Sequence, residues 1–196
     1  MAIAINGSGT ITGISVGGLP DGIVDTDMIA NNAVTSAKAT GRGITQADEW
    51  RVTASFNTSN ANIITTNWAR NSTNFSVLGS GMSESSGIFT FPQTGIYKIE
   101  FNTLTKSYNQ QVKYVVGEII TTSNNFSSEG SAGFASQSYS NDDDANVTAN
   151  VSCIFDVTNT STHKCKFTVY SEHSITWEGD STRNRTYATF IRLGDT

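Results

Sequence analysis

The chain has 196 residues, enough for one domain of about 150 residues with a short appendage and too few for two full domains. Only 15% of the residues are charged, so Ser, Thr, Asn and Gly must supply most of the polar surface, and these residues favour strands and turns over long helices. The net charge of −5 comes without a basic cluster that would neutralise a row of phosphates, so we expect no nucleic-acid partner.

The N-terminal segment, residues 1–42, is rich in Gly and carries only isolated Ile and Val residues. Residues 21–30 can be laid over residues 31–40 as a degenerate repeat, which places Val24 over Val34. A segment with one thin apolar stripe gains stability by winding around copies of itself, because association buries the stripe. We therefore predict an extended, intertwined stalk, with a flexible linker as the alternative.

Two other functions of this segment are not expected. Its first residues have no basic region and only a short apolar run, so we expect no secretory signal, and no later stretch is long enough for membrane insertion. Residues 7–13 superficially resemble a phosphate-binding loop, but no Lys follows them and no helical pattern begins there. We therefore predict no nucleotide site.

From residue 43 onward, apolar residues alternate with polar ones, which is typical of half-buried strands. The clearest run covers residues 87–101, where Pro92 and Gly95 fit a turn between two strands. Phe89 and Phe91 share one face of the run before the turn, and Tyr97, Ile99 and Phe101 share one face of the run after it. Further strands are predicted at residues 112–120, 147–157, 165–169 and 187–193. Turn-rich loops separate them, so we predict an all-β antiparallel sandwich over residues 43–196.

A long segment between two predicted strands, residues 123–146, mixes Ser, Gly and Asn with aromatic residues. This composition is typical of adaptable binding loops, and we predict that Phe126, Phe134 and Tyr139 contact a receptor. Asp142 to Asp144 could offer oxygen ligands to Ca²⁺, but a calcium site also needs carbonyl groups in a fixed geometry. We favour a solvated acidic loop and expect no cofactor and no metal.

Two cysteines lie in successive predicted strands, and the register points both thiols toward the core. If Asn159 marks the tip of a hairpin, Cys153 and Cys165 lie opposite each other, and a disulfide then depends on the register. We favour buried, reduced thiols, because intracellular assembly is reducing. The two imidazoles, His163 and His173, lie in polar, loop-like surroundings, so we expect both to be solvated and neither to be catalytic.

Trp177 lies among acidic residues, with Glu172 before it and Glu178 and Asp180 after it. A sugar ring could stack on this indole, so Trp177 is a fourth candidate receptor contact, although a core position is more common for such a residue. The three acids motivate an alternative, a polysaccharide-degrading enzyme that uses a carboxylate pair. We favour a non-enzymatic protein, because no set of nucleophile, base and orienting group is evident.

A second apolar flank is predicted on the opposite parity from the core residues. Its members are Ile88, Ile96, Ile154, Ala188 and Phe190. An outward apolar stripe needs a partner surface, so the pattern favours self-association.

The spacing G-x-F-x-x-P-x-x-G-x-Y-x-I-x-F over residues 87–101 resembles the central signature of C1q/TNF-like jelly rolls. Residues 50–56 and 186–193 resemble the opening strand and the closing central strand of that family. The resemblance covers residues 44–196 and implies a jelly-roll head that forms a homotrimer. Residues 9–38 are similar to the repeated stalk sequences of tailed-bacteriophage fibres.

Together the two resemblances imply a structural protein of a bacteriophage virion, a tail or capsid fibre on the particle's exterior. Residues 1–42 would attach to other virion proteins, and the head in residues 43–196 would bind a host-surface glycan or protein. One alternative is a capsid decoration or fibre-connector protein that binds no receptor. Another is a secreted C1q-like ligand, which the expected lack of a signal peptide disfavours.

Overall fold

The computed structural model describes residues 4–5, 11–12, 43–72, 75, 77–108, 111–138 and 145–196. The chain divides into two units, Met1–Arg42 and Gly43–Thr196. In the first unit, strand β1 (Ala4–Ile5) pairs antiparallel with β2 (Ile11–Thr12). The remainder of the predicted stalk lies outside the described residues. In the part of the chain that the structure describes, no helix is long and apolar enough to cross a membrane.

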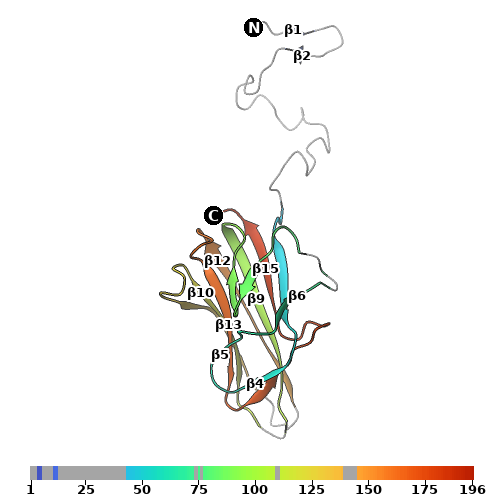
Figure 1. Cartoon of the computed structure of the whole chain (residues 1–196), viewed down its shortest axis with the longest axis vertical. Helices are drawn as coiled ribbons and strands as arrows, with labels where there is room; N and C mark the ends of the chain where they lie inside the picture. Colours follow the sequence, from blue (N-terminus) through green and yellow to red (C-terminus); the bar gives the residue numbers. More distant parts are fainter. Residues whose placement is uncertain are drawn as a thin grey trace. The chain divides into compact units, whose positions relative to one another are not determined.

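The second unit, called the head below, is a sandwich of two antiparallel sheets (Figure 1). The six-stranded sheet contains β5 (Asn62–Ile63), β7 (Ser83–Ser85), β8 (Ile88–Thr90), β10 (Val115–Thr122), β11 (Gly130–Gln137) and β13 (Lys164–Ser171). The seven-stranded sheet contains β3 (Ala47–Val52), β4 (Phe56–Thr58), β6 (Trp68–Arg70), β9 (Gly95–Lys106), β12 (Asn146–Val157), β14 (Ile175–Trp177) and β15 (Tyr187–Gly194). The predicted all-β antiparallel sandwich is confirmed.

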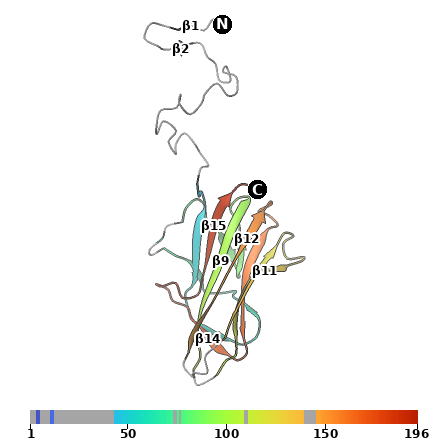
Figure 2. The same cartoon turned by 180° about the vertical axis from the view of Figure 1, so that it is seen from behind.

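Strand β9 shows why the sequence pattern predicted this fold. Buried and partly exposed positions alternate along its whole length, and Tyr97, Ile99 and Phe101 all point into the core. β9 pairs with β12 on one side and with β15 on the other, so it lies in the middle of its sheet (Figure 2). A central strand of this kind has one dry face and one exposed face, which the alternation requires.

The turn in the 87–101 run connects the two sheets. β8 belongs to the six-stranded sheet and β9 to the seven-stranded sheet, so the chain crosses the sandwich between Phe91 and Gly95. Gly95 has a φ of 144°, a conformation that favours glycine. The side chain of Phe91 is buried, and its ring centre lies 4.8 Å from that of Tyr97. The predicted turn is confirmed.

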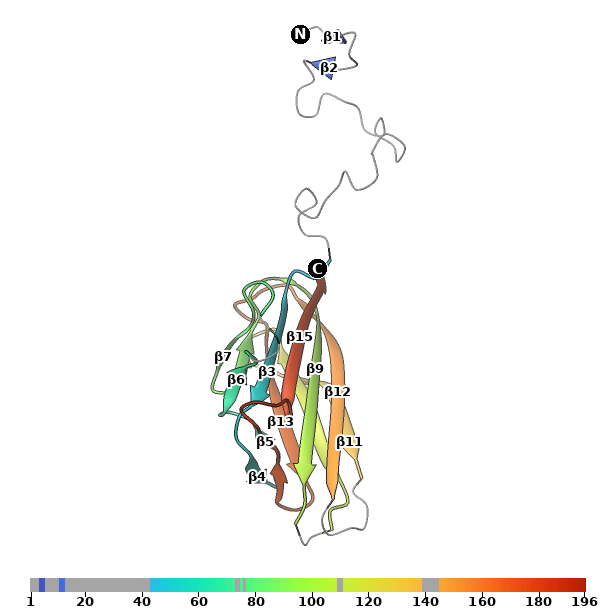
Figure 3. The same ribbon diagram turned by 90° about the vertical axis from the view of Figure 1, so that its right-hand side faces the viewer.

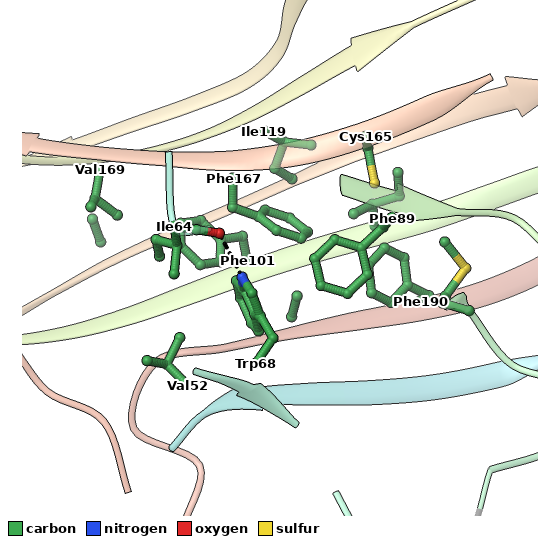
Figure 4. Packing of buried hydrophobic residues seen from close by; sticks show 14 of the residues in the cluster. Val52, Ile64, Trp68, Phe89, Phe101, Ile119, Cys165, Phe167, Val169 and Phe190 are labelled. Atoms are coloured by element: carbon green, nitrogen blue, oxygen red, sulfur yellow. Dashed lines mark hydrogen bonds between the residues drawn. The ribbon is translucent and has the colours of Figure 1, made fainter. Parts of the chain in front are cut away.

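The core between the sheets is dominated by aromatic side chains (Figure 4). The ring of Phe89 lies 5.2 Å from that of Trp68, 5.3 Å from that of Phe167 and 5.2 Å from that of Phe190. The indole Nε1–H of Trp68 donates a hydrogen bond of 2.8 Å to the carbonyl oxygen of Ile64, so its polar atom is satisfied inside the core. These rings join the two sheets into one packed body.

A buried carboxylate ties β3 to its neighbours. Asp48 accepts hydrogen bonds at Oδ1 from Glu49 N at 2.9 Å and from Arg70 Nε at 2.9 Å. At Oδ2 it accepts from Trp50 Nε1 at 2.8 Å, from Met82 N at 2.7 Å and from Arg70 Nη2 at 3.1 Å. The side chain of Asp48 is only 2% exposed, and protein N–H groups take the place of water at both of its oxygens.

The predicted hairpin around Asn159 is wrong. β12 pairs with β9, whereas β13 pairs with β10 in the other sheet, so the link between β12 and β13 crosses the sandwich. Cys153 and Cys165 are therefore not cross-strand partners, and both are free. Burial raises the pKa of Cys153 to about 11 and raises that of Cys165 well above its ordinary value.

The segment predicted as a binding loop contains a strand, which the sequence analysis missed. β11 pairs with β10 along most of its length, from Val115 opposite Gln137 to Thr121 opposite Gly130. Its sequence is mainly Gly, Ser and Ala, residues with little intrinsic preference for strands. The neighbouring strand therefore determines its conformation, and β11 lies at the edge of its sheet.

The two ends of the head differ in what they carry. The start of β3 and the C-terminal residues lie at one end, since Ala47 pairs with Ile191 (Figure 3). β14 lies at the opposite end, where its Thr176 pairs with Lys106, the last residue of β9, and β4 pairs with β14 there (Figure 2). We call this opposite end the far end of the head.

Candidate functional site

The outer face of the seven-stranded sheet is the first candidate site. Figure 3 shows β15, β9 and β12 side by side on this face. Lys98 of β9 lies between Ile154 of β12 and Ile191 of β15 in the register. Ile154 is 60% exposed and Leu193 is 50% exposed. Apolar side chains of this size, grouped and unburied, form a surface that a partner can cover.

Polar groups occupy the middle of the same face. Lys98 and Glu100 form an ion pair of 2.5 Å, and both side chains are partly exposed. Next along the strand, Asn102 lies between Asn150 and Tyr187. Glu100, Asn102, Asn150 and Tyr187 line a depression of about 230 Å³. Burial, then the charges of Glu49 and Glu100, raise the pKa of Tyr187. The face therefore combines an apolar end with a hydrogen-bonding centre, as interfaces do.

The predicted apolar flank is only partly correct. Ile96 and Ile154 do lie on the outer face of the seven-stranded sheet, and Ile88 is exposed but belongs to the other sheet. The prediction was wrong for Ala188 and Phe190, because these side chains are 0% and 1% exposed and form part of the core. β15 carries apolar residues on both parities, so alternation alone could not tell its two faces apart. The outward residues on β15 are Tyr187, Thr189, Ile191 and Leu193.

Of the four predicted receptor contacts, the three that the structure describes do not form one site. Phe134 is 55% exposed on β11, and Phe126 is partly buried with the Lys166 ammonium 4.5 Å from its ring centre. Tyr139 lies outside the described residues. The interpretation of Trp177 as a receptor contact was wrong, because its side chain is fully buried in the core. Its Nε1–H donates to the carbonyl oxygen of Thr58 at 3.4 Å, so no part of the indole is free to stack on a ligand.

Two tyrosines that the sequence analysis did not single out lie beside Phe134. Tyr170 comes from β13, and Tyr114 directly precedes β10. Their rings are 6.4 Å apart, and the ring of Phe134 is 6.3 Å from that of Tyr170. Only the pairing of β11 with β10, and of β10 with β13, brings these three residues together.

The three acids near Trp177 do not form a glycosidase pair. Glu178 is bound to Arg185, and Asp180 lies 3.4 Å from the same guanidinium. Hydrogen bonds from the N–H and O–H groups of Thr182 are the largest cause that lowers the pKa of Asp180 to about 2. Hydrogen bonding to Lys113 likewise lowers the pKa of Glu172. A general acid needs a raised pKa, so neither Asp180 nor Glu172 suits that role.

The two histidines differ from each other. His173 has a side chain 49% exposed, as expected, and lies 4.0 Å from Glu172. His163 was predicted to be solvated, and this is wrong, because it is only 8% exposed and its ring lies 5.6 Å from that of Phe155. The crossing of the chain between the sheets folds His163 onto the core, and its ring nitrogens lie 3.3 Å from the Thr158 hydroxyl and 3.2 Å from the Thr162 hydroxyl.

Within the described ranges, no group of three or more His, Cys, Asp or Glu side chains is placed to hold a metal ion. Asp142 to Asp144, the weak calcium candidate, lie outside those ranges.

The strand order and the single core between two sheets define the head as an antiparallel jelly-roll sandwich. The solved structures to which the chain is similar include TNF-like jelly rolls. Eiger TNF from S. frugiperda is 11% identical, covering 79% of this chain and 96% of that chain, with a TM-score of 0.60. Murine APRIL at pH 5.0 is 12% identical, covering 76% of this chain and 98% of that chain, with a TM-score of 0.55. At such low identity the likeness shows the fold alone, and it confirms the predicted TNF-like jelly roll. No family model matches the sequence, and no curated protein matches it.

Proposed function

We propose that the chain is a structural adhesion protein of a bacteriophage virion, a homotrimeric fibre that binds the host surface through its head. The observation that carries the proposal is the exposed apolar end of the seven-stranded sheet, which a single chain leaves in water. Residues 1–42 would form the stalk and attach to other virion proteins, as their resemblance to phage-fibre stalks implies. The head in residues 43–196 would then project from the particle.

The partner of this face is a further copy of the same chain. Each apolar side chain that association removes from water contributes about 1.5–3 kcal/mol when fully buried, and Ile154 and Leu193 are about half exposed. Lys98 and Glu100 already neutralise each other, so the face can be buried without leaving an isolated charge. The TNF-like jelly roll supports a threefold arrangement, since members of the C1q/TNF-like family commonly form trimers.

The mechanism is adhesion through many weak contacts, with no chemical turnover. A shallow site on one head binds a surface glycan only at about millimolar strength. Three heads on a fibre and several fibres on a particle raise the effective affinity by orders of magnitude, because each first contact raises the local concentration of the next site.

The test is adsorption of the fluorescently labelled full-length chain to a panel of bacterial strains. We expect binding to some strains, and we expect Ile154→Glu to abolish it by preventing association. Ile88→Glu is the matched control, because Ile88 is also exposed but lies on the other sheet. Failure to adsorb to any strain would overturn receptor binding and favour the decoration or connector alternative. Equal adsorption by Ile154→Glu would overturn the role of association.

A further inference from the structure

An aromatic cluster lies on the outer face of the six-stranded sheet, formed by Tyr114, Phe134 and Tyr170. Tyr170 is central, with its ring plane at 76° to that of Tyr114 and at 52° to that of Phe134. Tyr114 is 39% exposed and Phe134 is 55% exposed. The core lies on the other side of this sheet, where Ala135 packs against it. The cluster therefore adds little to the core and leaves ring surface open to solvent.

The surroundings of the aromatic cluster are polar. Glu118 of β10 lies directly opposite Phe134 on one side and Thr168 on the other. Thr168 is only 5% exposed, and its Oγ1 has no hydrogen-bond partner within the described part of the chain. Ser136, two residues along β11 from Phe134, is exposed on the same face. Tyr170 lies two residues along β13 from Thr168, on the same face as Glu118. Burial, followed by the charge of Glu118, raises the pKa of Tyr170.

We propose that the aromatic cluster, together with Glu118, is a binding site for a neutral saccharide. This inference rests on the proposed function and names the ligand class of the head. The C–H face of a pyranose ring packs against an aromatic ring, and its hydroxyl groups donate to a carboxylate and exchange hydrogen bonds with hydroxyls. Phe134 and Tyr170 supply the stacking surface, and Glu118 supplies the acceptor.

The charge and the size of the site select this class of ligand. An anionic ligand would meet the carboxylate of Glu118 next to the rings, where like charges repel. A protein partner covers about 800 Å² on each side of a standard interface, whereas the cluster is three side chains bordered by small polar residues such as Ser136. A compact ligand that combines an apolar face with hydroxyl groups fits both constraints.

The position of the cluster agrees with a role in adhesion. It lies on the sheet opposite to the one that carries Ile154, so burial of the outer face of the seven-stranded sheet does not itself cover it. β10 begins and β13 ends at the far end of the head. Val115 pairs with Ser171, and Ser171 N donates a hydrogen bond to the carbonyl oxygen of Ser59, which directly follows β4. Tyr114 and Tyr170 therefore lie toward the far end of the head. Residue 43, the first residue of the head, lies just before β3 in the chain, and β3 starts at the other end.

The test is a titration of the full-length chain with methyl β-D-glucopyranoside, methyl β-D-galactopyranoside and methyl α-D-mannopyranoside, followed by NMR. The same chain is applied to a printed array of neutral and sialylated oligosaccharides. We expect binding of at least one neutral sugar at about millimolar strength, with shifts of the aromatic resonances of the cluster. Phe134→Ala and Tyr114→Ala should each weaken that binding about five- to tenfold.

Tyr108→Ala is the matched control, because Tyr108 is also 55% exposed but lies outside the cluster, beside Lys106. It should leave the affinity unchanged. Since Phe134 and Tyr114 are exposed, their truncation leaves the core intact, and an unchanged far-ultraviolet circular dichroism spectrum checks this. Absence of neutral-sugar binding, preference for sialylated glycans only, or unchanged affinity in Phe134→Ala would each overturn the site.

Failure of this site and failure of the proposed function give different results. If the wild-type chain adsorbs to cells and Phe134→Ala adsorbs equally well, the saccharide site is wrong and the adhesion function stands. If the wild-type chain adsorbs to no strain, the adhesion function is wrong, whatever the sugar titration gives.

Discussion

The buried carboxylate of Asp48 provides a quantitative test of how the sandwich is held together. Replacing Asp48 with Ala leaves the N–H groups of Met82 and Trp50 without an acceptor and removes the carboxylate that forms an ion pair with Arg70. Removing one partner of a buried ion pair costs about 3–5 kcal/mol. Arg70 is 35% exposed and can turn to water, so we expect the lower end, about 3 kcal/mol. Asp48→Asn keeps the shape of the side chain, but its amide N–H₂ faces N–H donors where a carboxylate oxygen accepted from them. We expect it to lower the free energy of unfolding by about 1–3 kcal/mol.

The assay is urea unfolding of the full-length chain followed by tryptophan fluorescence, at one fixed protein concentration, because association couples to stability. The comparison is Glu129→Ala, which removes a carboxylate that is 42% exposed from its ion pair with Lys166 and should cost under about 1 kcal/mol. If Asp48→Ala lowered the free energy of unfolding by no more than Glu129→Ala does, the hydrogen bonds that Asp48 accepts from Arg70, Trp50 and Met82 would not stabilise the sandwich as proposed.

Two further predictions concern titratable groups. The pKa of Asp180 is lowered to about 2 from its ordinary value of 3.8, so the stabilisation from its hydrogen bonds is fully present above pH 3.8 and is lost as the pH falls through about 2. Carbon-13 NMR titration should find this low pKa, and Thr182→Val should raise it; a wild-type value near 3.8 would contradict the Thr182 contacts. Because burial raises the pKa of Cys153 to about 11 and raises the pKa of Cys165 well above its ordinary value, iodoacetamide at about pH 8 should modify neither thiol until urea unfolds the chain. Rapid modification of the folded chain, measured by mass spectrometry, would refute the burial of these thiols.

Strands with one consistently buried face could be predicted from the sequence. β9 and β12 carry most of their large apolar residues on the parity that faces the core, with outward exceptions such as Ile96 and Ile154. The strand predicted at residues 147–157 is β12, and the run predicted to end at residue 101 continues as β9 to Lys106. The turn after Phe91 could also be predicted, because Pro and Gly restrict or permit particular backbone angles.

Other features could not be predicted, because they depend on which strands become neighbours. β11 has a sequence with little strand preference and is a strand because β10 pairs with it. The acceptor role of Asp48 depends on Met82, which is 34 residues away in the chain. Trp177 had both a core and a surface interpretation, and only the pairing of β14 with β9 placed it inside.

The candidate ligand site shows the same limit. Phe134 was predicted from composition, but its neighbours Tyr114 and Tyr170 come from elements that become adjacent only through the pairing of three strands. The residues of a flat site on a sheet are spread over the sequence, so no local motif marks them.

Light scattering of the full-length chain tests the central claim most directly. If exposed apolar side chains on the seven-stranded sheet bring three copies together, the wild-type particle will have three times the chain mass of 21.0 kDa. Under the same conditions Ile154→Glu will have the mass of one chain, and Ile88→Glu will keep the wild-type mass. A folded wild-type chain that stays at 21.0 kDa at micromolar concentration would contradict the claim.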